Sequence, residues 1–216
     1  MRYLILILFI ATGICNASAQ QVFSEGVLQY DVAIDPPANQ EGVVQYKGTY
    51  TILVKGNTVK EILSLENGYE SALLFNHREK KVYSLKKAGG KQLAIELDWE
   101  QIEKRRIKYT DFKLNQLADK KEIAGTQASH ATVTYTNGNT VDVFYTNEWT
   151  SGNIVFDNYP DFKYLLLSFS NKHDDGLTIY FTARKIEAKP IDNAALRIPA
   201  NYKIISNKEY EQMKAK

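Results

Sequence analysis

The sequence has 216 residues, of which 24% are charged and 44% hydrophobic, and its formal net charge is +2. A charge this close to zero gives no reason to expect a nucleic-acid partner, which a strongly basic face would indicate. The chain has one cysteine and is long enough for a single domain to bury a core that stabilises the fold without a disulfide.

The start of the chain carries an unbroken apolar run over residues 3–14. The run is too short to cross a bilayer and is followed by small residues at Ala17 and Ala19, which is typical of a secretory signal peptide. We therefore expect residues 1–19 to be removed and the mature chain to be periplasmic or secreted, with no transmembrane segment. Cleavage there also removes Cys15, and with it any thiol for a disulfide, a metal site or catalysis.

Lipidation of Cys15 is the alternative for the same segment. Residues 12–15 loosely resemble the motif that precedes a lipidated cysteine. The residue directly before the cysteine is the bulky Ile14, where lipoprotein processing requires a small side chain. The unlipidated, secreted form is therefore favoured.

Alternating hydrophobicity dominates the first half of the mature chain. Leu28, Tyr30, Val32 and Ile34 are apolar at every second position, which predicts a half-buried strand. The same pattern predicts further strands over residues 46–54, 59–65, 72–75, 82–85 and 93–97, joined by turns rich in glycine and asparagine.

One convincing helix follows these strands. The Asp98 side chain can cap its first turn, and Trp99, Ile102 and Arg106 then fall at helical spacing. The helix has one apolar stripe, through which it can pack on the sheet.

Beyond the helix, a polar interval precedes residues 122–125. Residues 131–135 and 141–145 then alternate on either side of a Thr-Asn-Gly-Asn turn, the strongest hairpin signal in the chain. Strands are also expected over 164–170 and 177–186. Ser206 and Glu209 have the spacing of a capping box, so we expect residues 206–216 to form a short polar helix or tail.

The residue types that carry catalysis or bind metals show no pattern. His77, His130 and His173 are far apart, with none of the i, i+4 pairs of a helical metal site. No serine lies in a Gly-x-Ser-x-Gly turn. The sequence therefore predicts no catalytic residue, no metal site and no cofactor.

A basic cluster closes the helix. Its members are Lys104, Arg105, Arg106 and Lys108. Their position at the negative end of the helix dipole explains them structurally. The functional alternative is a surface for anionic lipid or for a partner protein.

The chain is rich in aromatic residues, with fourteen tyrosines and nine phenylalanines. They indicate either an ordinary core or a slot between the sheet and the helix that accepts an apolar ligand. The residues expected to line such a slot are Tyr50, Ile52, Ile95, Trp99, Ile102, Val143, Tyr145 and Phe181.

Three segments of the sequence resemble the LolA/LolB-like superfamily of periplasmic lipoprotein carriers and receptors, and more closely the uncharacterised secreted bacterial proteins of that type. They are residues 122–125, 141–146 and 198–203. After Gly125 those relatives carry an aromatic residue and a cysteine, whereas this chain has Thr-Gln-Ala-Ser over residues 126–129, so no family chemistry is carried over.

The resemblance implies a mostly β fold with minor α content, in which a single curved antiparallel sheet forms an incomplete β-barrel over one or two helices. We expect residues 20–205 to form this single half-barrel domain.

Three functions stay open. The first is a non-enzymatic envelope protein that binds a lipid, an acyl chain or a lipoprotein in the half-barrel. The second is an interaction or scaffold module of the envelope with a fully packed core. The third is a hydrolase with a carboxylate site, which the many acidic residues allow but no motif supports.

Overall fold

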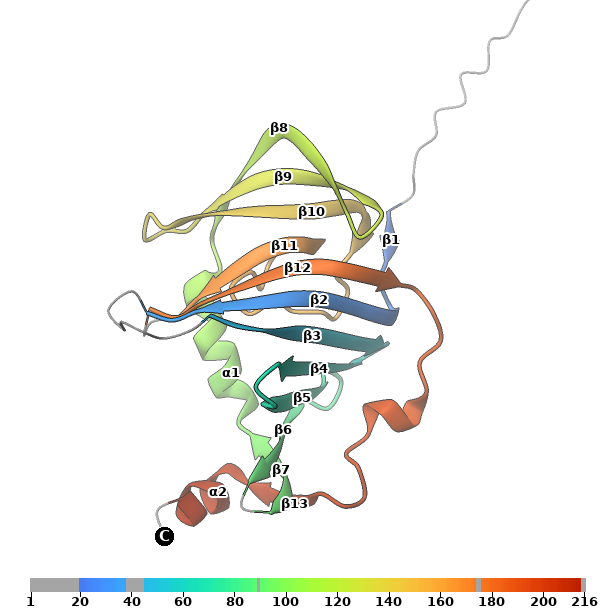
Figure 1. The fold of residues 1–216 in the computed structure, drawn as a ribbon, viewed down its shortest axis with the longest axis vertical. Coiled ribbons are helices and arrows are strands. Elements are labelled where there is room, and N and C mark those ends of the chain that lie inside the picture. The colour runs from blue at the N-terminus through green and yellow to red at the C-terminus, as the bar shows by residue number, and fades with distance from the viewer. Residues whose placement is uncertain (1–19, 38–44, 89, 174–175, 215–216) are drawn as a thin grey trace, which may run out of the picture.

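The computed structural model describes residues 20–37, 45–88, 90–173 and 176–214. The expected signal peptide and Cys15 lie outside the described residues. The prediction of a mostly β protein is confirmed, since a 13-stranded sheet makes up most of the molecule (Figure 1).

The strands lie in the order β13-β7-β6-β5-β4-β3-β2-β12-β11-β10-β9-β8, and β1 pairs with β10 off this path. The sheet is mostly antiparallel, and it curves without closing into a barrel. The strands are β1 (Gln21–Val22), β2 (Glu25–Asp35), β3 (Tyr46–Lys55), β4 (Thr58–Leu65), β5 (Glu70–Asn76), β6 (Lys81–Ala88), β7 (Lys91–Leu97), β8 (Lys113–Ile123), β9 (Thr126–Thr134), β10 (Thr140–Thr150), β11 (Tyr164–Lys172), β12 (Thr178–Glu187) and β13 (Lys203–Ser206). The helices are α1 (Trp99–Arg106) and α2 (Asn207–Lys214), with short 3-10 turns η1 (Ile107–Tyr109) and η2 (Asn193–Leu196).

Both helices begin as the sequence predicts. A carboxylate oxygen of Asp98 accepts from the Glu100 amide at 2.9 Å and from the Gln101 amide at 3.4 Å. At α2, the Ser206 hydroxyl accepts from the Glu209 amide, and the Glu209 carboxylate accepts from the Ser206 amide. These bonds satisfy backbone donors that the first turn of a helix leaves without partners.

Strand β8 occupies the interval that the sequence leaves without structure. It pairs with β9 only, and nearly all of its residues are exposed. An edge strand with neither face buried needs no apolar alternation, which is why the pattern missed it. A register shift between Gln116 and Lys120, followed by Lys121, makes this edge a poor template for pairing with another chain.

The inner face of the sheet holds the main core. Leu28, Tyr30, Val32 and Ile34 point to this face, as their alternation predicts. The segment over residues 151–163, between β10 and β11, packs onto the same face and contributes its own large side chains. They are Ile154, Phe156, Tyr159 and Phe162. Part of the half-barrel is therefore filled by the protein itself.

Residues 188–202 pack against part of the opposite face. Ile191 and Leu196 pack with Val27 in a separate small cluster. The Lys55 ammonium donates to the Ile191 carbonyl at 2.8 Å, and the Lys60 ammonium to the Ala195 carbonyl at 2.9 Å. On the inner face, α1 crosses the sheet (Figure 1).

Candidate functional site

A cleft lies between α1, the inner face of β3–β5 and the segment 151–163. It has two parts, an outer cavity of about 390 Å³ beneath α1 and an inner one of about 180 Å³ against β3, β4 and β12. Both are lined by Leu73, Asp157, Asn158 and His173, so the two parts adjoin. Their sizes suit one small ligand, for which pockets of roughly 300–1,000 Å³ are usual.

The walls of the cleft combine apolar and polar side chains in about equal number. The outer part adds Phe75, Leu97, Ile102, Arg105, Arg106, Lys108 and Tyr109. The inner part adds Tyr50, Glu61, Leu63, Ser71, Asn171, Ile179 and Phe181. An apolar chain can lie against the leucine, isoleucine and phenylalanine side chains while a polar head group meets the charged ones.

Glu61 is a carboxyl group on the apolar face of β4. The alternation of β4 directs Val59, Glu61 and Leu63 inward together, and Glu61 pairs across the strands with Ile52 on β3 and Leu73 on β5. Its side chain is only 9% exposed. An acidic residue is almost never buried this far without a specific partner.

Burial, together with the nearby Asp157 carboxylate, raises the pKa of Glu61 to about 8. A hydrogen bond from the Tyr50 hydroxyl and the positive charge of Arg106 act in the opposite direction. Burial outweighs these two contacts, so Glu61 is protonated and neutral at pH 7.

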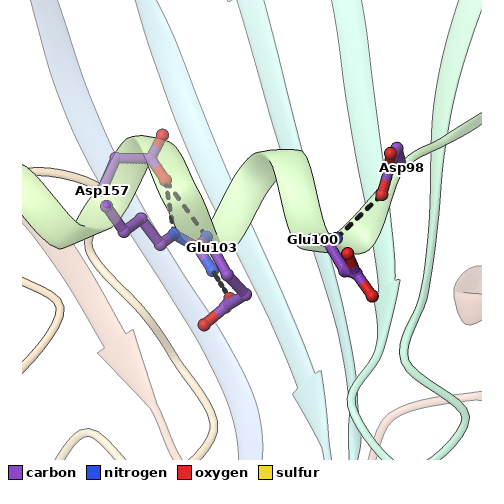
Figure 2. Close-up of polar contacts among 5 residues, drawn as sticks. Asp98, Glu100, Glu103 and Asp157 are labelled. Carbon is purple, nitrogen blue, oxygen red and sulfur yellow. Dashed lines mark hydrogen bonds and ion pairs between the residues drawn. The ribbon is translucent and has the colours of Figure 1, made fainter.

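Arg106 joins α1 to the segment 151–163. Its Nε and Nη2 donate to Oδ1 of Asp157 at 3.2 and 3.1 Å, and its Nη1 donates to Oε1 of Glu103 at 3.1 Å. Figure 2 shows Asp157 and Glu103 beside α1, with dashed lines that mark these contacts. The guanidinium also lies 5.6 Å from the centre of the Phe75 ring, over the wall of the cleft.

The variant Arg106→Ala is expected to lower the free energy of unfolding by about 1–2 kcal/mol, because it removes charged hydrogen bonds and the packing of the side chain. We place the effect at the low end because both carboxylates are more than half exposed. Urea unfolding measures this loss of free energy, and hydrogen exchange of the α1 amides shows whether it affects the helix. The exposed neighbour Arg105→Ala is the control, with an expected change within about 0.5 kcal/mol. Equal effects of the two variants would contradict this role for Arg106.

Trp99 and His77 close the edge of the cleft near the start of α1. The His77 ring stacks on Phe75 with centroids 6.0 Å apart, and Trp99 meets His77 edge-on at 5.5 Å. Burial lowers the pKa of His77, and the charge of Arg106 lowers it further. His77 is thus a neutral packing residue at pH 7 rather than a surface histidine.

The predicted ligand-binding residues fall into distinct places. Tyr50, Ile102 and Phe181 line the cleft, and Trp99 packs beside it. The structure does not bring the other four to it. Ile52, Val143 and Tyr145 are buried in the main core, and Ile95 packs with Leu93, Ile205 and Tyr210. The sequence could not distinguish residues that line the cleft from residues that pack in the core, because both kinds occupy apolar, inward positions of their elements.

The prediction of a basic surface at the end of α1 needs one correction. Arg106 is only 6% exposed and belongs to the cleft, since α1 turns this side chain toward Asp157 and Phe75. Lys104, Arg105 and Lys108 are exposed. A role of these three residues at a lipid or protein surface stays a prediction.

Several polar residues of the cleft were not identified from the sequence, and four of them determine its chemistry. They are Glu61, Asp157, Asn171 and His173. Only Glu61 left a signal, because it occupies an inward position in an otherwise apolar alternation. The others come from β11 and its neighbouring loops, whose approach to β4 depends on the whole topology.

Within the described residues, no group of three or more histidine, cysteine, aspartate or glutamate side chains could hold a metal ion. In the same part of the chain, no helix has the length and apolar character needed to cross a membrane.

No protein family matches the sequence, and no curated protein matches it either. Solved structures are similar in fold. An uncharacterised conserved protein from Thermus thermophilus is 8% identical, with a TM-score of 0.50, and the match covers 86% of this chain and 93% of that one. PNGF-II is 15% identical with a TM-score of 0.46, and the match covers 88% of this chain and 33% of that one.

A LolA superfamily protein, NE2245 from Nitrosomonas europaea, is 10% identical with a TM-score of 0.39, and the match covers 83% of this chain and 92% of that one. MucB from Pseudomonas aeruginosa in complex with MucA is 12% identical with a TM-score of 0.45, covering 85% of this chain and 59% of that one. The chain thus spans about a third of PNGF-II and under two thirds of MucB. The match to the Thermus protein shows the fold, and a LolA superfamily protein is among the similar structures.

Proposed function

We propose that this protein is a non-enzymatic binding protein of the bacterial envelope that holds a small ligand with an apolar chain beneath α1. One observation carries the proposal: α1 spans the inner face of the sheet and leaves a cleft whose wall is formed by Leu73, Phe75, Leu97 and Ile102. A fully packed half-barrel would leave no such space. The periplasmic or secreted location belongs to the same proposal and is supported by the apolar run over residues 3–14.

The size of the cleft limits the ligand. The core side chains of residues 151–163 occupy the half-barrel between β9 and β12, so a large lipid with several chains has no room there. A single acyl or alkyl chain fits the two adjoining cavities better. The ligand class is therefore a single-chain amphiphile or one chain of a lipoprotein.

Displacement of an apolar fluorescent probe by dodecanol tests the proposal, together with native mass spectrometry of protein purified from its own envelope. Leu73→Trp should weaken dodecanol binding by about tenfold or more, because Leu73 lines both cavities and the larger ring fills them. The matched control is Ser64→Trp, which places the same ring on the opposite face of β4. Equal binding by both variants, or no binding by the unaltered protein, would overturn the proposal.

A second candidate is favoured by one observation. Glu61 and Asp157 line the same cavity, and a neutral carboxyl beside a carboxylate is the pairing that glycoside hydrolysis uses. Against it, Arg106 already holds Oδ1 of Asp157. Turnover of a panel of nitrophenyl glycosides that is abolished in Glu61→Gln would favour the hydrolase, and we expect no turnover.

A further inference from the structure

The inner cavity, next to Glu61, has polar groups that accept hydrogen bonds. The buried Oδ1 atom of Asn171 has no hydrogen-bond partner among the described residues, and Asn171 lines this cavity together with Glu61 and Asp157. The Tyr50 hydroxyl is already engaged with Glu61. A buried acceptor without a donor is costly, so a ligand that brings donors gains affinity here.

The charges around this cavity are unbalanced. The carboxyl groups of Glu61 and Asp157 line it, whereas the buried cation Arg106 lines only the outer cavity and is already bound to Asp157 and Glu103. Arg105 and Lys108 line only the outer cavity. An anionic group pushed inward would meet the Asp157 carboxylate and would keep Glu61 protonated. A cation would allow Glu61 to ionise and would be paired by it.

Two aromatic rings complete the inner cavity. Tyr50 and Phe181 line it, with centroids 5.2 Å apart and planes inclined at 63°. The electron-rich faces of such rings attract an ammonium or guanidinium group, and more strongly where water is excluded. The acceptors and the carboxyl groups therefore select the same chemistry, and the two aromatic side chains in the lining suit it as well.

We propose that the inner cavity binds the cationic head of an amphiphile, a primary ammonium or guanidinium group, while its apolar chain lies beneath α1 against Leu73, Phe75 and Ile102. Glu61 is the main partner of the head group, and Asn171 supplies a neutral acceptor. The inference rests on the proposed function, because it names the head group of the ligand in that same cleft.

Binding of a cation beside Glu61 should be coupled to the release of a proton. The groups that face Glu61 are Tyr50 from β3, Asp157 from the segment 151–163 and Arg106 from α1, with His173 beside them in the cavity. Glu61 is neutral at pH 7, and a bound cation favours its ionised form, so binding releases a proton. Affinity for the cation should rise as the pH approaches 8.

The experiment compares dodecylamine, dodecanol and dodecanoate, which share a chain and differ in head group, by calorimetry below their critical micelle concentrations. We expect dodecylamine to bind the unaltered protein about tenfold more tightly than dodecanol, as one charge-assisted contact allows. In buffers of different ionisation enthalpy at pH 7, it should release close to one proton.

Glu61→Gln should abolish both the preference for dodecylamine and the proton release, so that dodecylamine and dodecanol bind this variant with similar affinity. The matched control is Glu70→Gln, which removes an exposed carboxylate from the neighbouring strand β5 and should keep both. Asn171→Leu is a second variant, expected to weaken dodecylamine by a smaller factor than Glu61→Gln does, because it removes only the neutral acceptor.

The outcomes separate the two proposals. Equal affinity for the three amphiphiles, or tighter binding of dodecanoate, would overturn the cationic head and leave the proposed function standing. If none of the three binds, both fall. A preference for dodecylamine that survives in Glu61→Gln would place the cation elsewhere and also overturn the inference.

Discussion

In the unaltered protein, the titration of Glu61 is expected to lower the free energy of unfolding by roughly 3–5 kcal/mol as the pH rises, and Glu61→Gln should remove this pH dependence. The carboxyl ionises near pH 4.5 in the unfolded chain and near pH 8 in the folded protein. The folded state therefore binds this proton more tightly. Stability contributed by the group is fully present below about pH 4.5 and is lost as the pH rises through about 8, at about 1.4 kcal/mol per pH unit. A glutamine side chain does not titrate, so the free energy of unfolding of this variant changes less with pH over this interval.

Urea unfolding of both proteins at about pH 5 and about pH 8.5 measures this difference, because all other titrating groups are common to the two and cancel. Glu70→Gln is the control for removing an exposed carboxylate, and its curve should parallel that of the unaltered protein. Parallel curves for the unaltered protein and Glu61→Gln would show that Glu61 is ionised in the folded state at pH 7.

Phe162→Ala is expected to lower the free energy of unfolding by about 3–5 kcal/mol. Phe162 is 4% exposed and joins the segment 151–163 to the sheet. Its ring stacks on Phe112 at 6.0 Å between centroids and meets Tyr145 edge-on at 5.5 Å. Removing the ring opens an apolar cavity that the surrounding strands cannot close, and that cavity should take up a small apolar molecule such as benzene.

Urea unfolding with and without benzene measures both effects of Phe162→Ala. Tyr180→Ala is the control, since it deletes an aromatic ring that is 45% exposed on β12 and should cost much less. If the two variants lose the same stability, the segment 151–163 is not the packed filling of the half-barrel that its contacts indicate.

Much of the fold could be predicted because the two faces of most strands differ. In β2, the side chains of Leu28, Tyr30 and Val32 face the core, so burial and sequence follow the same period of two. The start of α1 was predictable for a local reason, since Asp98 caps residues adjacent to it.

Other elements depend on contacts that leave no local pattern. Strand β13 pairs in parallel with β7, more than a hundred residues earlier in the chain. The segment 151–163 shows no hydrophobic periodicity, because it is a loop made of consecutive turns. One turn is closed by a hydrogen bond from the Tyr159 amide to the Phe156 carbonyl at 2.7 Å. A sequence shows such side chains as aromatic but not as buried.

The candidate site was predictable only in part for the same reason. Tyr50, Ile102 and Phe181 were expected to line a slot and do so, since each lies on the apolar face of its element. The polar residues that give the cleft its chemistry converge from different elements. Glu61 comes from β4 and Asp157 from the segment 151–163, and only the folded sheet brings them together.

Photo-crosslinking with an alkyl probe that carries a diazirine in its chain tests the central claim, that a ligand lies beneath α1, most directly. After irradiation and proteolysis, we expect mass spectrometry to find the label on peptides that contain Leu73 and Phe75 from β5 and Ile102 from α1. The label should disappear from these peptides in Leu73→Trp and persist in Ser64→Trp. Labelling confined to other surfaces, such as β8, or unchanged by Leu73→Trp, would contradict the account.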